Sequence, residues 1–194
     1  ITDAVVKQIE KCVDLGGRRI IKKKIGNKAV SEVLPTVPQV AVFDTSFHHT
    51  IPAINYMYAI PYEYYEKYRV RKYGFHGTSH KFVARVGAEM FGLDFENSKI
   101  VTCHIGNGGS ISAIKDGKCV DTSMGLTPLE GLMMGTRSGD IDGGAVTFIM
   151  EKEHLDAAGV SNLLNKKSGV MGIFGKSSDM RDLENAVAAG DPKA

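Results

Sequence analysis

Three short β-type segments between residues 99 and 123 constrain the fold of this chain more than any other feature. The first, KIVTCHI at Lys99–Ile105, is apolar and β-branched, which predicts a buried strand. GNGG then makes a turn, SISAIK alternates, and Asp116-Gly117 is a hairpin turn before KCVDTS. The pattern predicts a strand, a glycine turn, a strand, a hairpin and a third strand.

Helical patterns flank these strands. Thr78 or Ser79 can cap a helix that runs through Phe82 and Met90 to Gly92. Beyond a long Gly/Pro/Met loop from Ser123 to Gly144, three further helices are predicted at 145–153, 156–166 and 177–189, the last capped by Ser177 or Ser178.

The first 68 residues predict mostly helices and one strand. Helical spacing predicts helices at 2–16 and 28–34, and six tyrosines between Ile51 and Tyr68 suggest short helices that pack their rings on a core. Between them, QVAVFD is a short apolar segment that predicts a buried strand ending at Asp44.

Composition excludes several classes of protein. No apolar run approaches the ~20 residues that a membrane-spanning helix needs, and no secretory signal is visible. Three scattered cysteines without a CxxC pair argue against a disulfide framework or a zinc knuckle and favour the reducing cytoplasm. The net charge of +2 is too small to indicate a nucleic-acid partner for the whole molecule. The basic run Arg18–Lys24 is the local exception: it is either a solvated surface or, less commonly, a patch that binds an anion or RNA.

The turn CHIGNGGS is the first candidate site. Glycines leave room for backbone N–H groups to converge on a phosphate, and His104 and Asn107 add side-chain donors. The turn is not a P-loop, because no Lys-Ser/Thr follows, and not a dinucleotide fingerprint, because a strand follows it. A tight β-turn without a ligand is the alternative.

Four other residues are candidates for chemistry. Arg137, in TRSGD, offers paired donors suited to a phosphoryl group in transit, although a solvated loop arginine is the common case. His76 precedes a helix and can donate to an anion there, and its spacing from His80 also leaves zinc binding open. Asp44 can bind magnesium, accept a proton or cap a turn. Asp179 suits the first turn of a helix without any further role.

Four motifs in order resemble those of the acetate kinase family: FDTSFH, YGFHGTSH, the run from Cys103 to Asp142, and SSDMRDL. The resemblance implies a partial ribonuclease-H-like or actin-like ATPase fold of the α/β class. Residues 1–50 would then be the remainder of the first domain, and 51–194 the larger part of the second, truncated at its C-terminal side. The nucleotide would lie in a cleft between the two domains.

The resemblance also assigns roles. Asp44 would be the catalytic carboxylate near magnesium and acetate, with an indirect link to the metal, and His76 and Arg137 would stabilise the transferring phosphoryl group. Phe75 and Pro128 would line the acyl pocket. The remaining implied residues bind ATP or ADP: His104, Ile105, Gly106, Asn107 and Gly108 at the phosphates, and Asp179, Met180 and Arg181 beside the nucleoside.

The family implies acetate and acetyl phosphate as substrates, Mg²⁺ as cofactor, and a homodimer at full length, without nucleic acid or membrane. Propionate or butyrate kinase, and a non-catalytic actin-like nucleotide-binding module, remain alternatives.

Two departures from the family pattern stand out. The family's opening serine-rich phosphate motif and its closing glycine loop and magnesium-linked glutamate are not found here, which predicts negligible catalysis by this chain alone. Gly16–Asn27 also replaces a family acyl-pocket loop, which suggests a reading-frame error or a degraded copy.

Overall fold

The structure, a computed structural model, describes residues 42–194. The predicted helices at 2–16 and 28–34, the basic run and the atypical segment Gly16–Asn27 lie outside the described residues. Its elements, in chain order, are η1 (Ser46–Thr50), α3 (Ala53–Tyr56), α4 (Glu63–Tyr68), α5 (Gly77–Met90), η2 (Phe95–Asn97), β1 (Lys99–Ile105), β2 (Gly109–Lys115), β3 (Lys118–Thr122), α6 (Gly143–Lys152), α7 (Ala157–Lys166), α8 (Gly169–Phe174) and α9 (Met180–Ala188).

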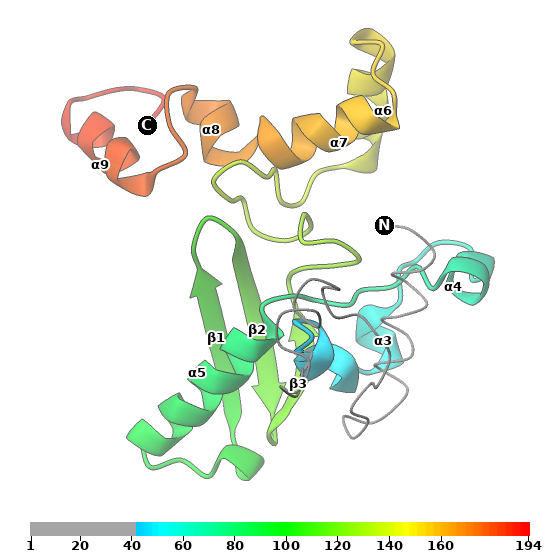
Figure 1. The fold of residues 1–194 in the computed structure, drawn as a ribbon, viewed down its shortest axis with the longest axis vertical. Helices are drawn as coiled ribbons and strands as arrows, with labels where there is room; N and C mark the ends of the chain where they lie inside the picture. Colours follow the sequence, from blue (N-terminus) through cyan, green and yellow to red (C-terminus); the bar gives the residue numbers. More distant parts are fainter. Residues whose placement is uncertain (1–41) are drawn as a thin grey trace, which may run out of the picture.

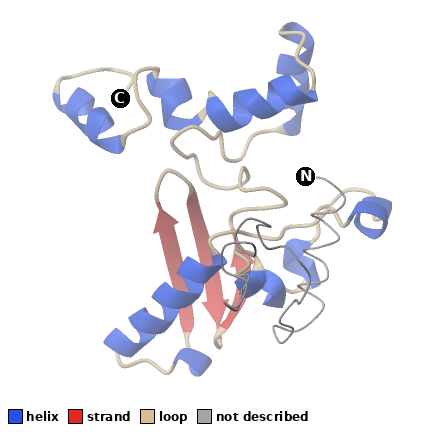
Figure 2. Ribbon diagram, viewed as in Figure 1, coloured by secondary structure: helices blue, strands red, loops and turns tan. Residues whose placement is uncertain are grey.

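The three predicted strands form one antiparallel sheet in the order β1-β2-β3 (Figure 2). Gly109 pairs with Ile105 across the glycine turn, so that turn closes directly onto the ladder. At the other end, Asp116 and Gly117 have φ of 50° and 72°. Positive φ at both central residues is typical of a turn that matches the strand twist, which explains the Asp-Gly pair.

Helix α5 packs on β1 and η1, and η1 packs on β3 (Figure 1). The core between them contains Phe47, Ile51, Ala84, Ile114 and Cys119, with Tyr56, Phe95 and Ile100 packed against it. The short helices predicted between Ile51 and Tyr68 are confirmed as α3 and α4. Tyr62, Tyr64 and Tyr68 nevertheless leave their rings largely exposed.

Helix α5 differs in detail from its prediction. It begins at Gly77, with His76 as its N-cap residue, so neither Thr78 nor Ser79 caps it. Its buried side is Gly77, His80, Ala84 and Ala88, while Phe82 and Met90 are 67% and 77% exposed. Residues three or four apart share a helix face. Because glycine and alanine on this face let the helix lie close to the sheet, the face with small residues is the one that packs on it.

Two strand predictions need correction. Val42 and Phe43 are not in a strand, and Asp44 lies in a turn. Strand β1 is not buried, because Val101 and Ile105 are 67% and 71% exposed. The reason is its place at the edge of the described sheet, where β2 is its only strand neighbour.

The loop at 123–142 has no regular structure, as predicted, and leads to a second group of helices, α6 to α9 (Figure 1). Carboxylates cap three of them: Asp142, Asp156 and Asp179 each accept a backbone N–H of the first turn. The cap of α9 is thus Asp179, not Ser177 or Ser178. The short helix α8 is absent from the prediction. Within residues 42–194, no helix is long and apolar enough to cross a bilayer.

Candidate active site

The site is centred on the glycine turn between β1 and β2. The N–H of Gly106 donates to the carbonyl of Gly108 at 3.0 Å, which tightens the turn. A Cβ added at Gly108 would lie 3.2 Å from Nη1 of Arg137 and 3.5 Å from Nε2 of His76. The two candidate catalytic side chains therefore converge on Gly108, and a residue without a side chain leaves the space between them open.

His104, at the end of β1, forms one wall of this space. Its ring stacks on that of His76, with the centroids 3.9 Å apart and the planes at 22°. Its Nδ1 is 2.9 Å from the hydroxyl of Ser79, on the first turn of α5. Burial, with smaller effects of His104 and Arg137, lowers the pKa of His76, and Asp44 acts in the opposite sense. His76 is accordingly neutral near pH 7.

His76 is held by backbone contacts on both sides. Its N–H donates to the Asp44 carboxylate at 2.7 Å, and the N–H of Gly77 donates to the Asp44 carbonyl at 2.8 Å. His48 Nε2 donates to the carbonyl of Phe75 at 2.8 Å. These bonds stabilise the left-handed backbone of His76, whose φ is 58°. Asp44 therefore lies beside His76 and stays exposed.

Beneath His76 runs a buried series of polar side chains. The hydroxyl of Ser110 lies 2.9 Å from His76 Nδ1 and 2.7 Å from His80 Nε2. His80 Nδ1 in turn lies 2.7 Å from the hydroxyl of Thr102. Burial and the neighbouring histidines lower the pKa of His80 to about 4. Both ring nitrogens of His80 are engaged by hydroxyls, which leaves neither of them for zinc. In the described part of the chain, no three His, Cys, Asp or Glu side chains form a metal-binding group.

Arg137 contacts its own loop. Its Nη1 donates to the carbonyl of Pro128 at 3.0 Å and lies 3.7 Å from the sulfur of Met134. Arg137 and Pro128, which the sequence placed in the site separately, are thus brought together. Phe75 is half-buried and lies next to this region, because it immediately precedes His76 in the sequence.

Tyr58 fixes the loop that carries Pro128. Its hydroxyl donates to the carboxylate of Glu130 and accepts the N–H of Leu126 at 2.9 Å. Burial and the bond to Glu130 raise the pKa of Tyr58. Sequence reasoning missed this pair, because a tyrosine in an aromatic segment gives no signal for a partner 72 residues away.

The start of α9 lies near the glycine turn. The N–H of Gly135 donates to the carbonyl of Asn107 at 3.2 Å. A Cβ at Gly135 would lie 2.3 Å from Oδ1 of Asn107 and 3.4 Å from Cβ of Ser178. The segment that begins α9 is therefore on the side of the turn where Asn107 projects.

The nucleoside candidates form a local exposed unit. The guanidinium of Arg181 donates to both carboxylate oxygens of Asp179, which lowers the pKa of that carboxyl to about 2. Met180, which lies between these two residues in the sequence, is 54% exposed. Ile105, Gly106 and Asn107 at the turn are exposed as well.

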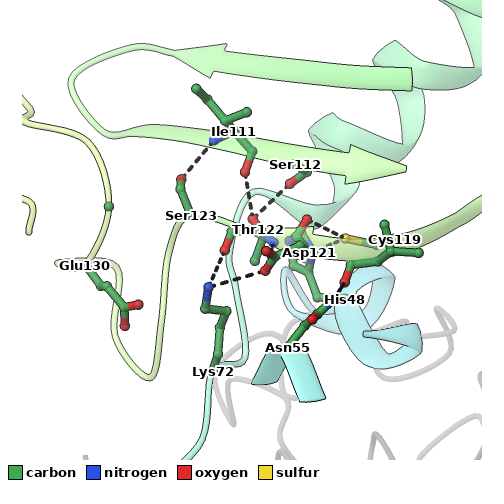
Figure 3. Close-up of polar contacts among 12 residues, drawn as sticks. His48, Asn55, Lys72, Ile111, Ser112, Cys119, Asp121, Thr122, Ser123 and Glu130 are labelled. Atoms are coloured by element: carbon green, nitrogen blue, oxygen red, sulfur yellow. Dashed lines mark hydrogen bonds and ion pairs between the residues drawn. The ribbon is translucent and has the colours of Figure 1, made fainter. Parts of the chain in front are cut away.

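A second polar network connects the segment before His76 with strands β2 and β3 (Figure 3). Lys72 donates to the Thr122 carbonyl at 2.9 Å and to the Asp121 carboxylate at 3.3 Å. The hydroxyl of Thr122 lies 2.9 Å from that of Ser112, on β2. The network ties the segment that precedes His76 to the sheet. Nothing in the sequence beyond polar residues on strands indicates this network.

Comparison with solved structures defines the class of the fold. All of this chain superposes on about half of an acetate kinase from Porphyromonas gingivalis, with a TM-score of 0.85 and 51% identity over 48% of that chain. A propionate kinase from Francisella tularensis gives a TM-score of 0.84 at 42% identity, with 100% of this chain and 50% of that one covered. The fold is thus the α/β actin-like ATPase fold of these kinases, as predicted.

The sequence comparisons define the family. Residues 1–194 match the model of the acetokinase family. The chain is 75% identical over 169 residues to the acetate kinase of Phocaeicola vulgatus, which covers 87% of this chain and 42% of that protein. It is 62% identical to that of Bacteroides fragilis over 100% of this chain and 49% of that protein. The chain belongs to the acetokinase family, and it spans about half the length of the curated relatives it matches.

Proposed function

We propose that this chain is the part of an acetate kinase that holds the transferring phosphoryl group during reversible transfer between ATP and acetate, which gives acetyl phosphate and ADP. The convergence of His76 and Arg137 on Gly108 carries the proposal. Phosphoryl transfer depends on positioning and charge neutralisation. His76 and Arg137 both offer donors over Gly108, and the Arg137 guanidinium supplies the positive charge.

The residues of the turn fit the phosphates of ATP. Ile105, Gly106 and Asn107 are exposed beside half-buried Gly108, so their backbone N–H groups could reach a phosphate there, and Asn107 adds an amide. Arg137 and His76 face that position and would stabilise charge on the phosphoryl oxygens. Asp179, Met180 and Arg181, near the turn through Ser178, would lie beside the nucleoside.

Asp44 is placed for the acceptor side of the reaction. Its carboxylate is exposed beside His76. Mg²⁺ usually keeps several waters and is bound by one or two carboxylates together with nucleotide phosphates, so a single exposed carboxylate fits an indirect contact. When bound, the ion would neutralise charge between phosphates. Phe75 precedes His76 and the Pro128 carbonyl accepts a hydrogen bond from Arg137, so both would border a small acyl group beside these two residues.

Propionate is the second candidate substrate, because a propionate kinase superposes as well as an acetate kinase does. We place residues 1–50 in the first domain and 51–194 in the second, and propose a cytoplasmic homodimer for the complete protein. A non-catalytic nucleotide-binding module would have no use for Arg137 over the turn.

The test joins residues 28–194 of this chain to the remaining segments of the Phocaeicola vulgatus enzyme, whose own sequence then replaces the atypical Gly16–Asn27. It measures acyl phosphate formation with acetate and with propionate. We expect activity in the chimera, negligible activity in the chain alone, and at least a tenfold loss in Arg137→Ala, about 1.4 kcal/mol of barrier. Arg137→Lys, which keeps the charge but not the paired donors, should fall between the two. A smaller loss in Arg137→Ala would remove Arg137 from the chemistry.

A further inference from the structure

Four side chains form one continuous hydrogen-bonded series from the middle of β1 to the candidate site. Thr102, His80 and Ser110 are 4%, 1% and 0% exposed, and His76 ends the series at Gly108. The three links measure 2.7, 2.7 and 2.9 Å. Each is short enough for a well-formed hydrogen bond.

The buried Ser110 proton has the two rings as its hydrogen-bond partners, so it must be donated to one of them, and the series can then be oriented in two ways. In one, Thr102 donates to His80 Nδ1, His80 Nε2–H donates to Ser110, and Ser110 donates to His76 Nδ1. In the other, every bond is reversed. Because a neutral imidazole carries a single N–H, the first orientation gives both histidines the Nε2–H form and the second gives both the Nδ1–H form.

Thr102 selects between the two orientations. Among the described residues, its buried hydroxyl has His80 Nδ1 as its only hydrogen-bond partner. In the first orientation the hydroxyl proton has an acceptor, whereas in the second that buried proton has none. Burying a donor without an acceptor is unfavourable, so the first orientation is preferred.

We propose that Thr102, His80 and Ser110 are positioning residues that hold His76 as its Nε2–H tautomer, so that its one proton points at the phosphoryl oxygens between Gly108 and Arg137. The opposite tautomer would present a lone pair to those oxygens. The idea rests on the proposed function for its catalytic meaning, but the tautomer itself does not depend on any ligand.

The groups around the series keep both rings neutral. His76 faces His104 on β1, Arg137 on the loop and Asp44 before η1. His80 faces the same His104 and Asp44, together with His48 on η1, whose ring centroid is 5.9 Å away. Burial lowers the pKa of both rings and outweighs the contribution of Asp44. A neutral ring makes the choice of tautomer decisive.

The first test measures tautomers directly by long-range ¹H–¹⁵N NMR of the ¹⁵N-histidine-labelled chain, at a pH where both rings are neutral. Signals lost in His76→Gln and His80→Gln assign the two rings. We expect both as Nε2–H. An Nδ1–H ring at either position would overturn the proposal, and no nucleotide is needed for this result.

The second test separates positioning from packing. Ser110→Ala removes the link, and His76 should become a mixture of tautomers. His80→Gln keeps an N–H donor close to Ser110 and an acceptor for Thr102, so His76 should stay Nε2–H. If both variants keep their backbone NMR spectra and His76 is unchanged in Ser110→Ala, the relay does not exist.

The chimera described above supplies the kinetic readout. Ser110→Ala should lower kcat on the order of 10- to 100-fold with little change in KM for ATP, since one donor to the transferring group is lost. His80→Gln should retain most of kcat. A chimera that is inactive even with the wild-type sequence would contradict the proposed function and leave the tautomer result standing. An active chimera with unchanged kcat in Ser110→Ala would refute the positioning role.

Discussion

Gly108 is the single residue on which the site depends most. An added Cβ would meet Nη1 of Arg137 at 3.2 Å, which is the far end of a flexible side chain. We therefore expect Gly108→Ala to fold normally and to displace Arg137, with a loss of about tenfold or more in activity of the chimera. The measurement is acetyl phosphate formation beside a thermal melt. Gly143→Ala, which meets nothing within 4 Å, is the matched control. A fully active Gly108→Ala would contradict the convergence.

His80 predicts a pH dependence of stability. Its pKa is about 4 when folded and 6.5 when unfolded, so the unfolded chain binds more protons between these values. The free energy of unfolding should therefore fall by up to ~3 kcal/mol as the pH drops from 6.5 to 4. Urea denaturation at several pH values measures it. His80→Gln should flatten the slope in this window. The Asp179 carboxyl, whose pKa is about 2, changes the free energy of unfolding only below this pH window. If the free energy of unfolding of His80→Gln depends on pH as strongly as that of the wild type, groups other than His80 cause the pH dependence.

The candidate site was predicted from sequence at its surface but not in its interior. His76, His104 and Arg137 were predicted, because each lies in a motif with a chemical reason to bind phosphate. Ser110 and Thr102 were not, because a hydroxyl on an alternating strand looks like any other polar residue. Only the folded structure places Ser110 between His76 and His80, and Thr102 beyond His80.

Helix α5 is positioned by the absence of a side chain at Gly77. A Cβ there would lie 2.3 Å from the backbone carbonyl oxygen of Asp44, which cannot move without shifting the turn that holds His76. We expect Gly77→Ala to lower the free energy of unfolding by about 1–3 kcal/mol. Gly87→Ala, on the same helix with nothing within 4 Å, should instead stabilise by up to about 1 kcal/mol. Equal melting points for the two variants would contradict this account.

The loop at 123–142 depends on Tyr58. Removing its hydroxyl in Tyr58→Phe leaves the Leu126 N–H and the Glu130 carboxylate without that partner, at a cost of about 1–3 kcal/mol. Hydrogen exchange should increase around residues 125–130, while β1 and β2 keep their protection. Tyr64→Phe, whose ring is 42% exposed, is the control. Unchanged exchange in Tyr58→Phe would show that other contacts hold the loop.

The three strands of the sheet were predicted almost to the residue, whereas the strand expected to end at Asp44 is not formed at residues 42–44 and the helices were predicted less well. Asp116-Gly117 and the glycine turn fix both ends of β2, so little freedom remained. The buried side of α5 was missed, because apolar periodicity highlights Phe82 and Met90, whereas close packing on the sheet requires Ala84 and Ala88. Six-residue α8 begins at a glycine with φ of 64° and has no hydrophobic period to detect.

Several large apolar side chains of residues 42–194 are exposed to solvent. Val101 and Ile105 on β1, and Phe91 at the end of α5, are 67%, 71% and 80% exposed. An open strand edge with apolar residues favours pairing between copies. We expect the chain alone to associate in a concentration-dependent way by light scattering, and Val101→Lys to reduce this. A monodisperse monomer at every concentration would contradict the expectation.

The bond between Arg137 and the Pro128 carbonyl has a consequence for selectivity. That bond uses one N–H of a guanidinium that has five, so Arg137 is held over Gly108 and keeps donors for a ligand. The oxygens of a phosphoryl group carry charge and accept two donors at once, whereas an uncharged ligand offers neither the charge nor the paired acceptors. An arginine held in this position therefore favours phosphorylated ligands over uncharged ligands of the same size.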